Sequence, residues 1–169
     1  PAGTSVSTST VVFEYAIGDI IIGSNNNSNF QITQGFSQPR SSSATVWTGA
    51  VNTDWNNPGN WSAGIPDSTD DIIISGGSNN PVINQLGAGC KNLTIASGGS
   101  VTISDSSYSL NADTLKIENG GQFNIFNGDI YTNNVIHSGI LNISEGTLDI
   151  DGNYTASGNV NANISGGTI

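Results

Sequence analysis

From Ile72 to the end of the chain, short runs of alternating apolar and polar residues are separated by Gly, Asn and Ser. Residues 92–95 (NLTI) are followed by the segment ASGGS and by residues 101–103 (VTI). The same order returns 22 residues later, with residues 114–117 (TLKI), the segment ENGGQ and residues 123–125 (FNI). Self-similarity at a fixed offset indicates a repeat architecture.

The repeat predicts short β-strands that turn at glycine-rich corners. Alternation with a period of two buries one face of each strand. Toward the C-terminus the period shortens to about 18–20 residues, where LNI at 141–143 and LDI at 148–150 continue the pattern. A period of this size, holding two or three strands, is typical of one coil of a parallel β-solenoid.

The fixed offset predicts which residues stack in the core. Leu93 is expected over Leu115, and Val101 over Phe123, in a column of apolar side chains that runs through four or five coils. An antiparallel β-sandwich also has short strands and frequent turns, so it stays open as the rival fold. The predicted class is all-β, with Asn and Ser at the corners bonded to their equivalents in neighbouring coils.

The N-terminal region has a different pattern and predicts a separate element. Residues 1–10 form a polar leader, and residues 11–39 hold two apolar runs, VVFEYAIGDIII and FQITQGF, around GSNNNSN. This arrangement predicts one β-hairpin with a long loop, followed by the linker PRSSS. We therefore divide the chain into residues 1–43 (leader, hairpin and linker) and residues 44–169 (β-helix), with a tryptophan-rich cap over 44–71.

Composition and charge exclude several functions. Only 9% of the 169 residues are charged and the net charge is −10, so the clustered Lys and Arg that neutralise phosphates are missing. Nucleic-acid binding is therefore not expected, and neither is membrane insertion, since no apolar run approaches the length of a membrane-spanning helix. The chain begins at Pro1 rather than Met, which indicates a processed or trimmed segment.

Three segments carry a resemblance to a known group of proteins. Residues 13–39 end in a TQGF-Q-P motif, and residues 47–75 follow the pattern W-x-G, W, NW, G-x-P and DD-x-x-I. Residues 90–103, CKNLTIASGGSVTI, resemble the first coil that follows such an opening. In these segments the chain resembles the secreted surface proteins of bacteroidete-type bacteria. The motif residues at the end of the first segment are Thr33, Gln34, Gly35, Phe36, Gln38 and Pro39.

The resemblance implies an extracellular protein with a right-handed parallel β-helix of the adhesin type. It also implies export by the type IX secretion route, whose cargo ends in a sorting domain that is cleaved on export. The resemblance further suggests the short Asp-Ser/Thr-apolar signal for O-glycosylation, here at Ser68 and Thr114.

The cap contains the most distinctive candidate binding residues. Trp47, Trp55 and Trp61 are expected to cover the open end of the hydrophobic column, and a sugar-stacking platform is the alternative. Asp54, Asp67, Asp70 and Asp71 supply hard oxygen ligands of the kind Ca²⁺ prefers. Their spacing matches no calcium loop, so a turn before the strand at 72–74 is the preferred interpretation, and no metal or cofactor is predicted.

Catalytic residues are sparse, and we predict that the protein is not an enzyme. Asp105, Asp129 and Asp149 fall near one-coil spacing, and a shared face would bring carboxylates together as glycoside hydrolysis requires. His137 is interpreted as a turn or surface residue, and Cys90 as a small buried side chain.

These observations lead to two functional hypotheses. The first is a structural or adhesive surface protein that self-assembles head to tail into a filament, with the N-terminal strands covering the uncapped end of a neighbouring copy. The second is a carbohydrate-binding or polysaccharide-cleaving β-helix, with surface glycans as partners. The residues assigned to assembly are Phe13, Tyr15, Ile17, Ile20, Ile22, Phe30, Ile32, Phe36, Ile164 and Ile169.

Overall fold

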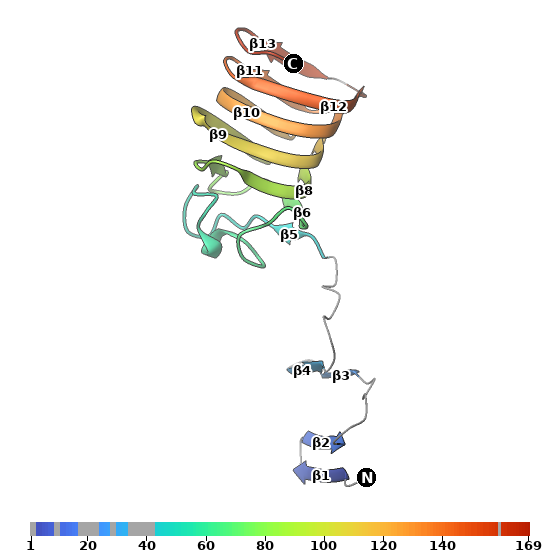
Figure 1. Ribbon diagram of the computed structural model, residues 1–169. Helices are drawn as coiled ribbons and strands as arrows, with labels where there is room; N and C mark the ends of the chain where they lie inside the picture. Colours follow the sequence, from blue (N-terminus) through green and yellow to red (C-terminus); the bar gives the residue numbers. More distant parts are fainter. Residues whose placement is uncertain (1–2, 9–10, 17–23, 28–29, 34–42, 159) are drawn as a thin grey trace. The chain divides into compact units, whose positions relative to one another are not determined.

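The computed structural model describes residues 3–8, 11–16, 24–27, 30–33, 43–158 and 160–169. Contacts divide the chain into two compact units, Pro1–Ser41 and Ser42–Ile169. Strands account for 57% of the structure and helix for 2%, and the parallel strands form a β-solenoid of about five turns. The all-β solenoid class predicted from the repeat is therefore confirmed (Figure 1).

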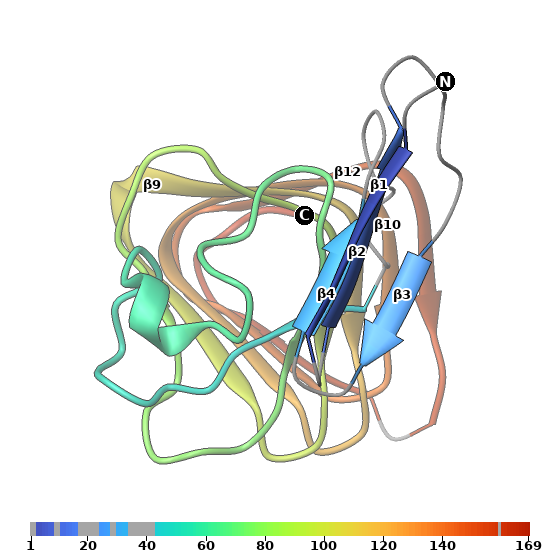
Figure 2. The ribbon, with the colours of Figure 1, turned by 90° about the horizontal axis from the view of Figure 1, so that it is seen from below.

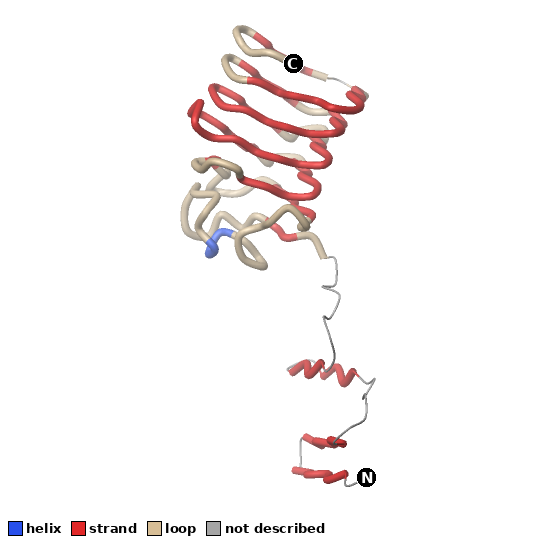
Figure 3. Tube along the Cα trace, in the orientation of Figure 1, coloured by secondary structure: helices blue, strands red, loops and turns tan. Residues whose placement is uncertain are grey.

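The solenoid is one sheet of nine parallel strands that wraps around itself coil by coil (Figure 3). Every pair of strands within this sheet runs in the same direction, which removes the antiparallel sandwich for this unit. The strands are β5 (Thr45–Val46), β6 (Asp71–Ile74), β7 (Val82–Ile83), β8 (Ala88–Ile95), β9 (Ser100–Ile117), β10 (Gln122–His137), β11 (Ile140–Ile143), β12 (Thr147–Ala156) and β13 (Asn161–Ile164).

Each full coil passes through three strand segments, so the solenoid has three faces when seen along its axis (Figure 2). The first face holds β6, and the second holds β11 and β13. The third holds the first halves of β8 and β12. The long strands β9 and β10 continue around corners and contribute to all three faces. Equivalent residues therefore lie above one another at the spacing of neighbouring strands, about 4.8 Å.

The core consists of the columns that the repeat predicts. Leu93 lies over Leu115 on the first face, and Val101 over Phe123 on the second. All four side chains are fully buried. A third column, formed by Ala88, Leu110, Ile130 and Leu148, runs along the third face. Burying one Leu, Ile, Val or Phe side chain contributes about 1.5–3 kcal/mol, so the columns provide most of the stabilisation of the coils.

Paired glycines make the tight corner between the first and second faces. Gly120 has φ of +81°, a conformation that the third position of a type II turn reserves for glycine. The amide of Gly121 donates to the carbonyl oxygen of Glu118 across this turn, with N and O 2.8 Å apart. A Cβ on Gly121 would collide with the carbonyl oxygen of Ile95 in the coil below. The turn thus requires glycine at position 120, and the close approach of the neighbouring backbone requires it at position 121.

An asparagine ladder runs along the outside of the second face. Asn163 donates to Asn142, and Asn142 donates to Asn124, each from Nδ2 to Oδ1 over 2.8 Å. Asn124 in turn donates to Ser100 Oγ at 3.2 Å. The sequence predicted stacked Asn and Ser side chains at the corners, and Ser138 and Ser157 do bond there, with their Oγ atoms 2.9 Å apart. The asparagine ladder lies instead in the middle of a face, because Asn occupies the outward position of three successive triplets.

The N-terminal end of the solenoid is covered by residues 43–70. This segment is mostly loop and includes β5 and one short 3-10 helix, η1 (Pro58–Asn60). Asn60 is fully buried and holds the loop together. Its Oδ1 accepts from the amides of Val51 and Asn52, and its Nδ2 donates to Asn52 and to the Asp54 carbonyl oxygen. Among the described residues, no helix has the length and apolarity needed to cross a membrane.

The N-terminal unit differs from the single hairpin expected there. β1 (Gly3–Thr8) pairs with β2 (Val11–Ala16), and β3 (Ser24–Asn27) pairs with β4 (Phe30–Thr33), both antiparallel. Residues 3–8 of the predicted polar leader thus form a strand, and residues 24–27 of the predicted loop GSNNNSN form another. Only two residues separate the strands within each pair, so the local pairings cost less loop-closure entropy than a hairpin with a long loop.

Candidate functional site

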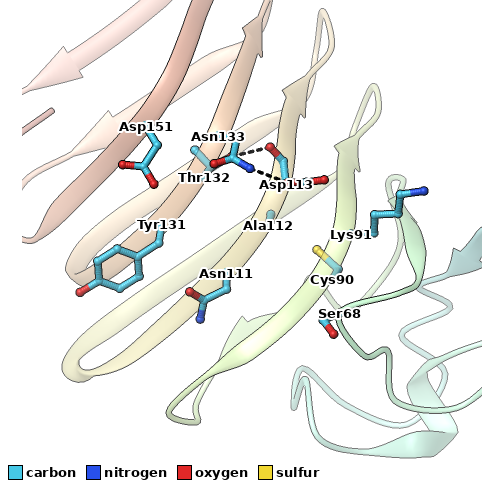
Figure 4. Close-up of a pocket in the computed structure, with 10 residues that line it drawn as sticks. All are labelled: Ser68, Cys90, Lys91, Asn111, Ala112, Asp113, Tyr131, Thr132, Asn133 and Asp151. Atoms are coloured by element: carbon cyan, nitrogen blue, oxygen red, sulfur yellow. Dashed lines mark hydrogen bonds between the residues drawn. The ribbon is translucent and has the colours of Figure 1, made fainter.

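An open groove of about 420 Å³ follows the corner between the third and first faces (Figure 4). It crosses four successive coils, because Cys90, Ala112 and Thr132 are register partners in β8, β9 and β10 and Asp151 follows in β12. The residues that line it are Ser68, Cys90, Lys91, Asn111, Ala112, Asp113, Tyr131, Thr132, Asn133 and Asp151.

The floor of the groove carries small side chains in three of its four coils, and the larger Ile150 continues this column in β12 as the partner of Thr132. Cys90, Ala112 and Thr132 are all buried and stand in register. Two residues earlier in β9 and β10, the third face carries the larger Leu110 and Ile130. The surface therefore sinks at the corner.

Two rows of outward side chains rise on the sides of this floor. One row is Asn111 and Tyr131, which are register partners, and Asp149 continues it in the next coil. The other row is Lys91, Asp113, Asn133 and Asp151, placed where the chain turns toward the first face. The side-chain Nδ2 of Asn133 donates to Asp113 Oδ1 at 2.6 Å, which fixes the positions of two side chains in this row.

The thiol of Cys90, at the floor of the groove, is unreactive near neutral pH. Burial raises the pKa of the Cys90 thiol to about 12, with a further contribution from the carboxylates of Asp71 and Asp70. Cys90 therefore stays a neutral thiol near neutral pH. The thiolate is the reactive form of cysteine, so this side chain is unreactive there. The buried position predicted for Cys90 is confirmed. The groove can hydrogen-bond a polar ligand through carboxylates, amides, hydroxyls and one ammonium group.

The three aspartates considered for glycoside hydrolysis do not form one column. Asp129 is the partner of Ser109 and Thr147, whereas Asp149 is the partner of Tyr131 two positions further along. Asp105 lies in the irregular stretch of β9 where the register with β10 shifts. The intervals between these aspartates, 24 and 20 residues, are longer than the offsets of the register on this face, which are 20 residues from Ser109 to Asp129 and 18 from Asp129 to Thr147, so the aspartates are not aligned.

His137 is a core residue, which corrects its interpretation as a turn or surface residue. It is fully buried and occupies the inward position that Ile117 holds in the coil below. Its Nδ1 lies 2.6 Å from the Tyr154 hydroxyl oxygen and its Nε2 lies 3.2 Å from the Gly139 carbonyl oxygen. A carbonyl oxygen only accepts, so Nε2 carries the proton and Nδ1 accepts from Tyr154.

Burial lowers the pKa of His137 because an imidazolium would be desolvated in the apolar column, and the bond to the Gly139 carbonyl opposes this effect in part. The ring is not among the side chains that line the corner groove. His137 therefore supplies no general base to the groove.

The three tryptophans lie at the end of the sheet, beyond β6, and pack against each other. Trp61 meets Trp47 and Trp55 edge to face, with ring centroids 4.8 Å apart in both pairs. Their exposed fractions are 4% for Trp47, 0% for Trp55 and 5% for Trp61, so no ring face is open for a sugar. The sugar-stacking alternative for these residues is therefore wrong, and their position is that of a cap.

Three of the four aspartates considered as calcium ligands accept hydrogen bonds in turns and loops, and the fourth, Asp71, begins β6 and accepts from the side chain of Asn92 at 2.6 Å. Asp67 accepts from the amide and hydroxyl of Thr69, and Asp70 accepts from the amide of Asp67. Asp54 accepts from the Asn56 amide and from Asn84. These bonds explain why the residues recur before the strand at 72–74. No group of three or more metal-ligating side chains occurs in the described part of the chain.

The residues assigned to assembly divide into three groups. Ile164 and Ile169 lie in the last coil with 48% and 53% of their surface exposed. Phe13 and Tyr15 lie in β2, and Phe30 and Ile32 lie in β4. The remaining four fall outside the described residues, and they are Ile17, Ile20, Ile22 and Phe36.

Within the described residues, β12 and β13 each pair with a strand on one side only. β13 pairs with β11 and has no second partner among the described strands. Large apolar side chains gather here, since Tyr154, Val160, Ile164 and Ile169 are each between 36% and 53% exposed. The two candidate glycosylation residues lie elsewhere, with Ser68 exposed beside the corner groove and Thr114 half-buried in β9.

The corner groove was not predicted from the sequence. Its floor residues Cys90, Ala112 and Thr132 recur at the spacing of the repeat, once in each of three successive coils. The interval is 22 residues from Cys90 to Ala112 and 20 from Ala112 to Thr132, so a search at one fixed offset would not have found the whole column.

A family model described as a domain of unknown function (DUF8693) matches residues 46–163, which is more than two thirds of the chain. The match begins within β5 and extends into β13, so it spans the cap and the coils. Neither the curated proteins nor the solved structures gave a match.

Proposed function

The chain belongs to the DUF8693 family, and we propose that it is a non-enzymatic structural and adhesive protein of the cell exterior that self-assembles through its terminal coil. The observation that carries the proposal is the difference between the two ends of the solenoid. One end is covered by the buried cluster of Trp47, Trp55 and Trp61. The other exposes the edge of β13 and the apolar residues around it.

A free strand edge beside exposed apolar side chains favours addition of a further strand. The edge offers unpaired backbone N–H and C=O groups, which bind any chain able to complete the ladder. Inward positions of the last coil, such as Ile164, become buried when another strand covers them. The contact is heterologous because the covered end differs from the free end, so repeated addition extends a filament rather than closing a dimer.

The N-terminal sequence contains a segment suited to this edge. Three triplets on the second face have the order apolar, Asn, apolar, namely 123–125 (FNI), 141–143 (LNI) and 162–164 (ANI). In β4, residues 30–32 (FQI) have the same order with Gln as the amide. A β4 strand from a second copy would continue both the apolar column and the asparagine ladder.

The chemistry of the corner groove supports a non-catalytic role. Its thiol has a raised pKa, and the buried His137 lies outside it. An extracellular location is part of the proposal and agrees with the sparse Lys and Arg of the chain and with the resemblance of residues 13–103. Surface glycans and other copies of the chain are the proposed partners.

The proposal is tested by removing residues 1–39 and examining full-length and shortened protein by negative-stain microscopy and sedimentation. We expect filaments from the full chain and monomers from the shortened chain. Circular dichroism of the shortened chain checks that unit Ser42–Ile169 keeps its strands. Filaments that persist without residues 1–39 would show that these strands are not used, and a full-length chain that stays monomeric would contradict self-assembly itself.

A further inference from the structure

We propose that the corner groove binds a neutral polysaccharide, with the sugar chain running parallel to the solenoid axis and successive sugar rings lying on successive coils. This site is separate from the free edge of β13, and the inference does not depend on self-assembly. It assigns a ligand class to residues that lie in β8, β9, β10 and β12 (Figure 4).

The groove has the dimensions of a site for an extended ligand. It crosses four coils, so its length is three strand spacings, or roughly 14 Å. Its volume of about 420 Å³ is within the range of small-molecule sites. The strand spacing is close to the length of one sugar ring, so each ring of an extended chain would lie at the equivalent position of the next coil, where the side chains differ.

The direction of the groove excludes peptide binding by strand addition. A peptide that adds to a sheet bonds to backbone groups along a free edge. Here the groove crosses the sheet, and the backbone groups of its two middle strands, β9 and β10, are already paired with coils on both sides. A ligand must therefore be recognised by the side chains that rise on both sides of the floor.

Those side chains match a ligand rich in hydroxyl groups. Asp113 and Asp151 accept hydrogen bonds, Lys91 donates them, and Asn111 and Asn133 do both. Tyr131 is 44% exposed and offers a ring face against which the C–H face of a sugar can pack. Among these six side chains, one hydrogen bond occurs, between Asn133 and Asp113. It holds the two middle side chains of one row in place.

Charge selects against acidic polymers. The groove holds two carboxylates against one ammonium group, and the whole chain carries a net charge of −10. Uronic-acid polymers and nucleic acids would be repelled. A neutral polysaccharide satisfies the hydrogen-bonding groups without this cost.

The test is affinity electrophoresis of the full chain through native gels that contain a neutral polymer or an acidic one. Hydroxyethyl cellulose, galactomannan and laminarin are the neutral probes, and polygalacturonate is the acidic probe. Calorimetry with the oligosaccharides of the retarding polymer, from disaccharide to hexasaccharide, then gives affinities. We expect at least one neutral polymer to retard the chain, with affinity rising as the oligosaccharide lengthens until it fills the groove.

Three variants connect binding to the groove. Tyr131→Ala removes the ring face and Asn111→Ala removes the neighbouring amide, and we expect each to weaken binding about tenfold. Phe126→Ala is the matched control, because Phe126 is also an exposed aromatic, 50% exposed, and does not line the groove. The proposal is overturned if no neutral polymer retards the chain, if polygalacturonate retards it more, or if Phe126→Ala weakens binding as much as Tyr131→Ala.

Discussion

At the scale of single residues, the buried position of His137 predicts that the coils are sensitive to acid. In three coils below, the equivalent inward position is occupied by Ile74, Ile95 and Ile117. Placing an imidazole in this column is tolerated because both ring nitrogens have partners, Tyr154 and the Gly139 carbonyl. These partners stabilise the neutral ring, and burial disfavours the charged one.

The lowered pKa predicts the direction of the pH dependence. Well above about pH 6.5, the ordinary pKa of histidine, His137 is neutral in both the folded and the unfolded chain, and stability does not depend on its protonation. As the pH falls below that value, the unfolded chain takes up a proton that the folded chain resists, so the free energy of unfolding decreases by up to about 1.4 kcal/mol per pH unit. Urea unfolding at pH 8 and pH 5 measures this loss.

The matched variant is His137→Ile, which restores the side chain of the coils below. We expect its stability to change less between the two pH values than that of the unaltered chain. Carboxylates titrate in both proteins, so the difference between the two isolates the imidazole. Equal pH dependence in both would show that His137 does not contribute to acid sensitivity.

Asn60 predicts a second residue-scale effect, in the cap. Its side chain is fully buried and makes four hydrogen bonds, so Asn60→Ala leaves the amides of Val51 and Asn52 without partners. We expect a loss of about 2–4 kcal/mol in the free energy of unfolding. Asn57→Ala is the control, since the Asn57 side chain caps η1 by accepting from the amide of Gly59, and its loss should cost about 1 kcal/mol. Tryptophan fluorescence follows both transitions, and equal losses would contradict the role of Asn60.

At the scale of elements, the glycine corner is the strictest requirement of the repeat. Gly121→Ala places a methyl group against the Ile95 carbonyl oxygen of the neighbouring coil and should cost about 2 kcal/mol or more. Gly77→Ala is the control, because a Cβ at Gly77 meets no atom within 4 Å. That change should be neutral or stabilising by up to about 1 kcal/mol. Thermal unfolding compares the two variants. Similar losses of stability in both would show that the close approach of Gly121 to the Ile95 carbonyl is not what requires glycine at the corner.

The elements that the sequence predicted well are those fixed by the repeat. The constant offset between the first coils predicted that Leu93 lies over Leu115. The prediction was possible because an apolar residue recurs at the same position of each coil and so forms a continuous column. The N-terminal pairing could not be predicted in this way, since alternation identifies a strand without identifying its partner. β1 and β3 were missed because their residues are mostly small and polar.

The same reasoning explains the residues that were misplaced. His137 follows Ile117 by a shorter interval than the offset of the earlier coils, so a search at that fixed offset passes over it. The corner groove was missed because small side chains such as Ala112 are noticed only when their neighbours in other coils are known. The polar residues on its sides are present in the sequence. Lys91, Asp113 and Asp151 lie close together only once the coils are stacked, so the sequence did not predict that they share one groove.

At the scale of the whole molecule, the proposed assembly depends on the difference between the two ends of the described solenoid. A charge introduced at the free end blocks strand addition, because the new strand would bury it without a partner. Ile164→Lys does this at β13, where Ile164 is 48% exposed. We expect this variant to remain monomeric and folded under conditions in which the unaltered chain polymerises.

Ile136→Lys adds the same charge at another partly exposed isoleucine, 39% exposed, in β10 away from the free edge. Filaments should form normally in this control, because a strand added at β13 does not cover the side of β10. Sedimentation of both variants, followed by microscopy of the pellets, separates a block at the edge from a general effect of charge. If Ile164→Lys polymerises as well as Ile136→Lys, subunits join through the sides of the solenoid and the free edge plays no part in growth.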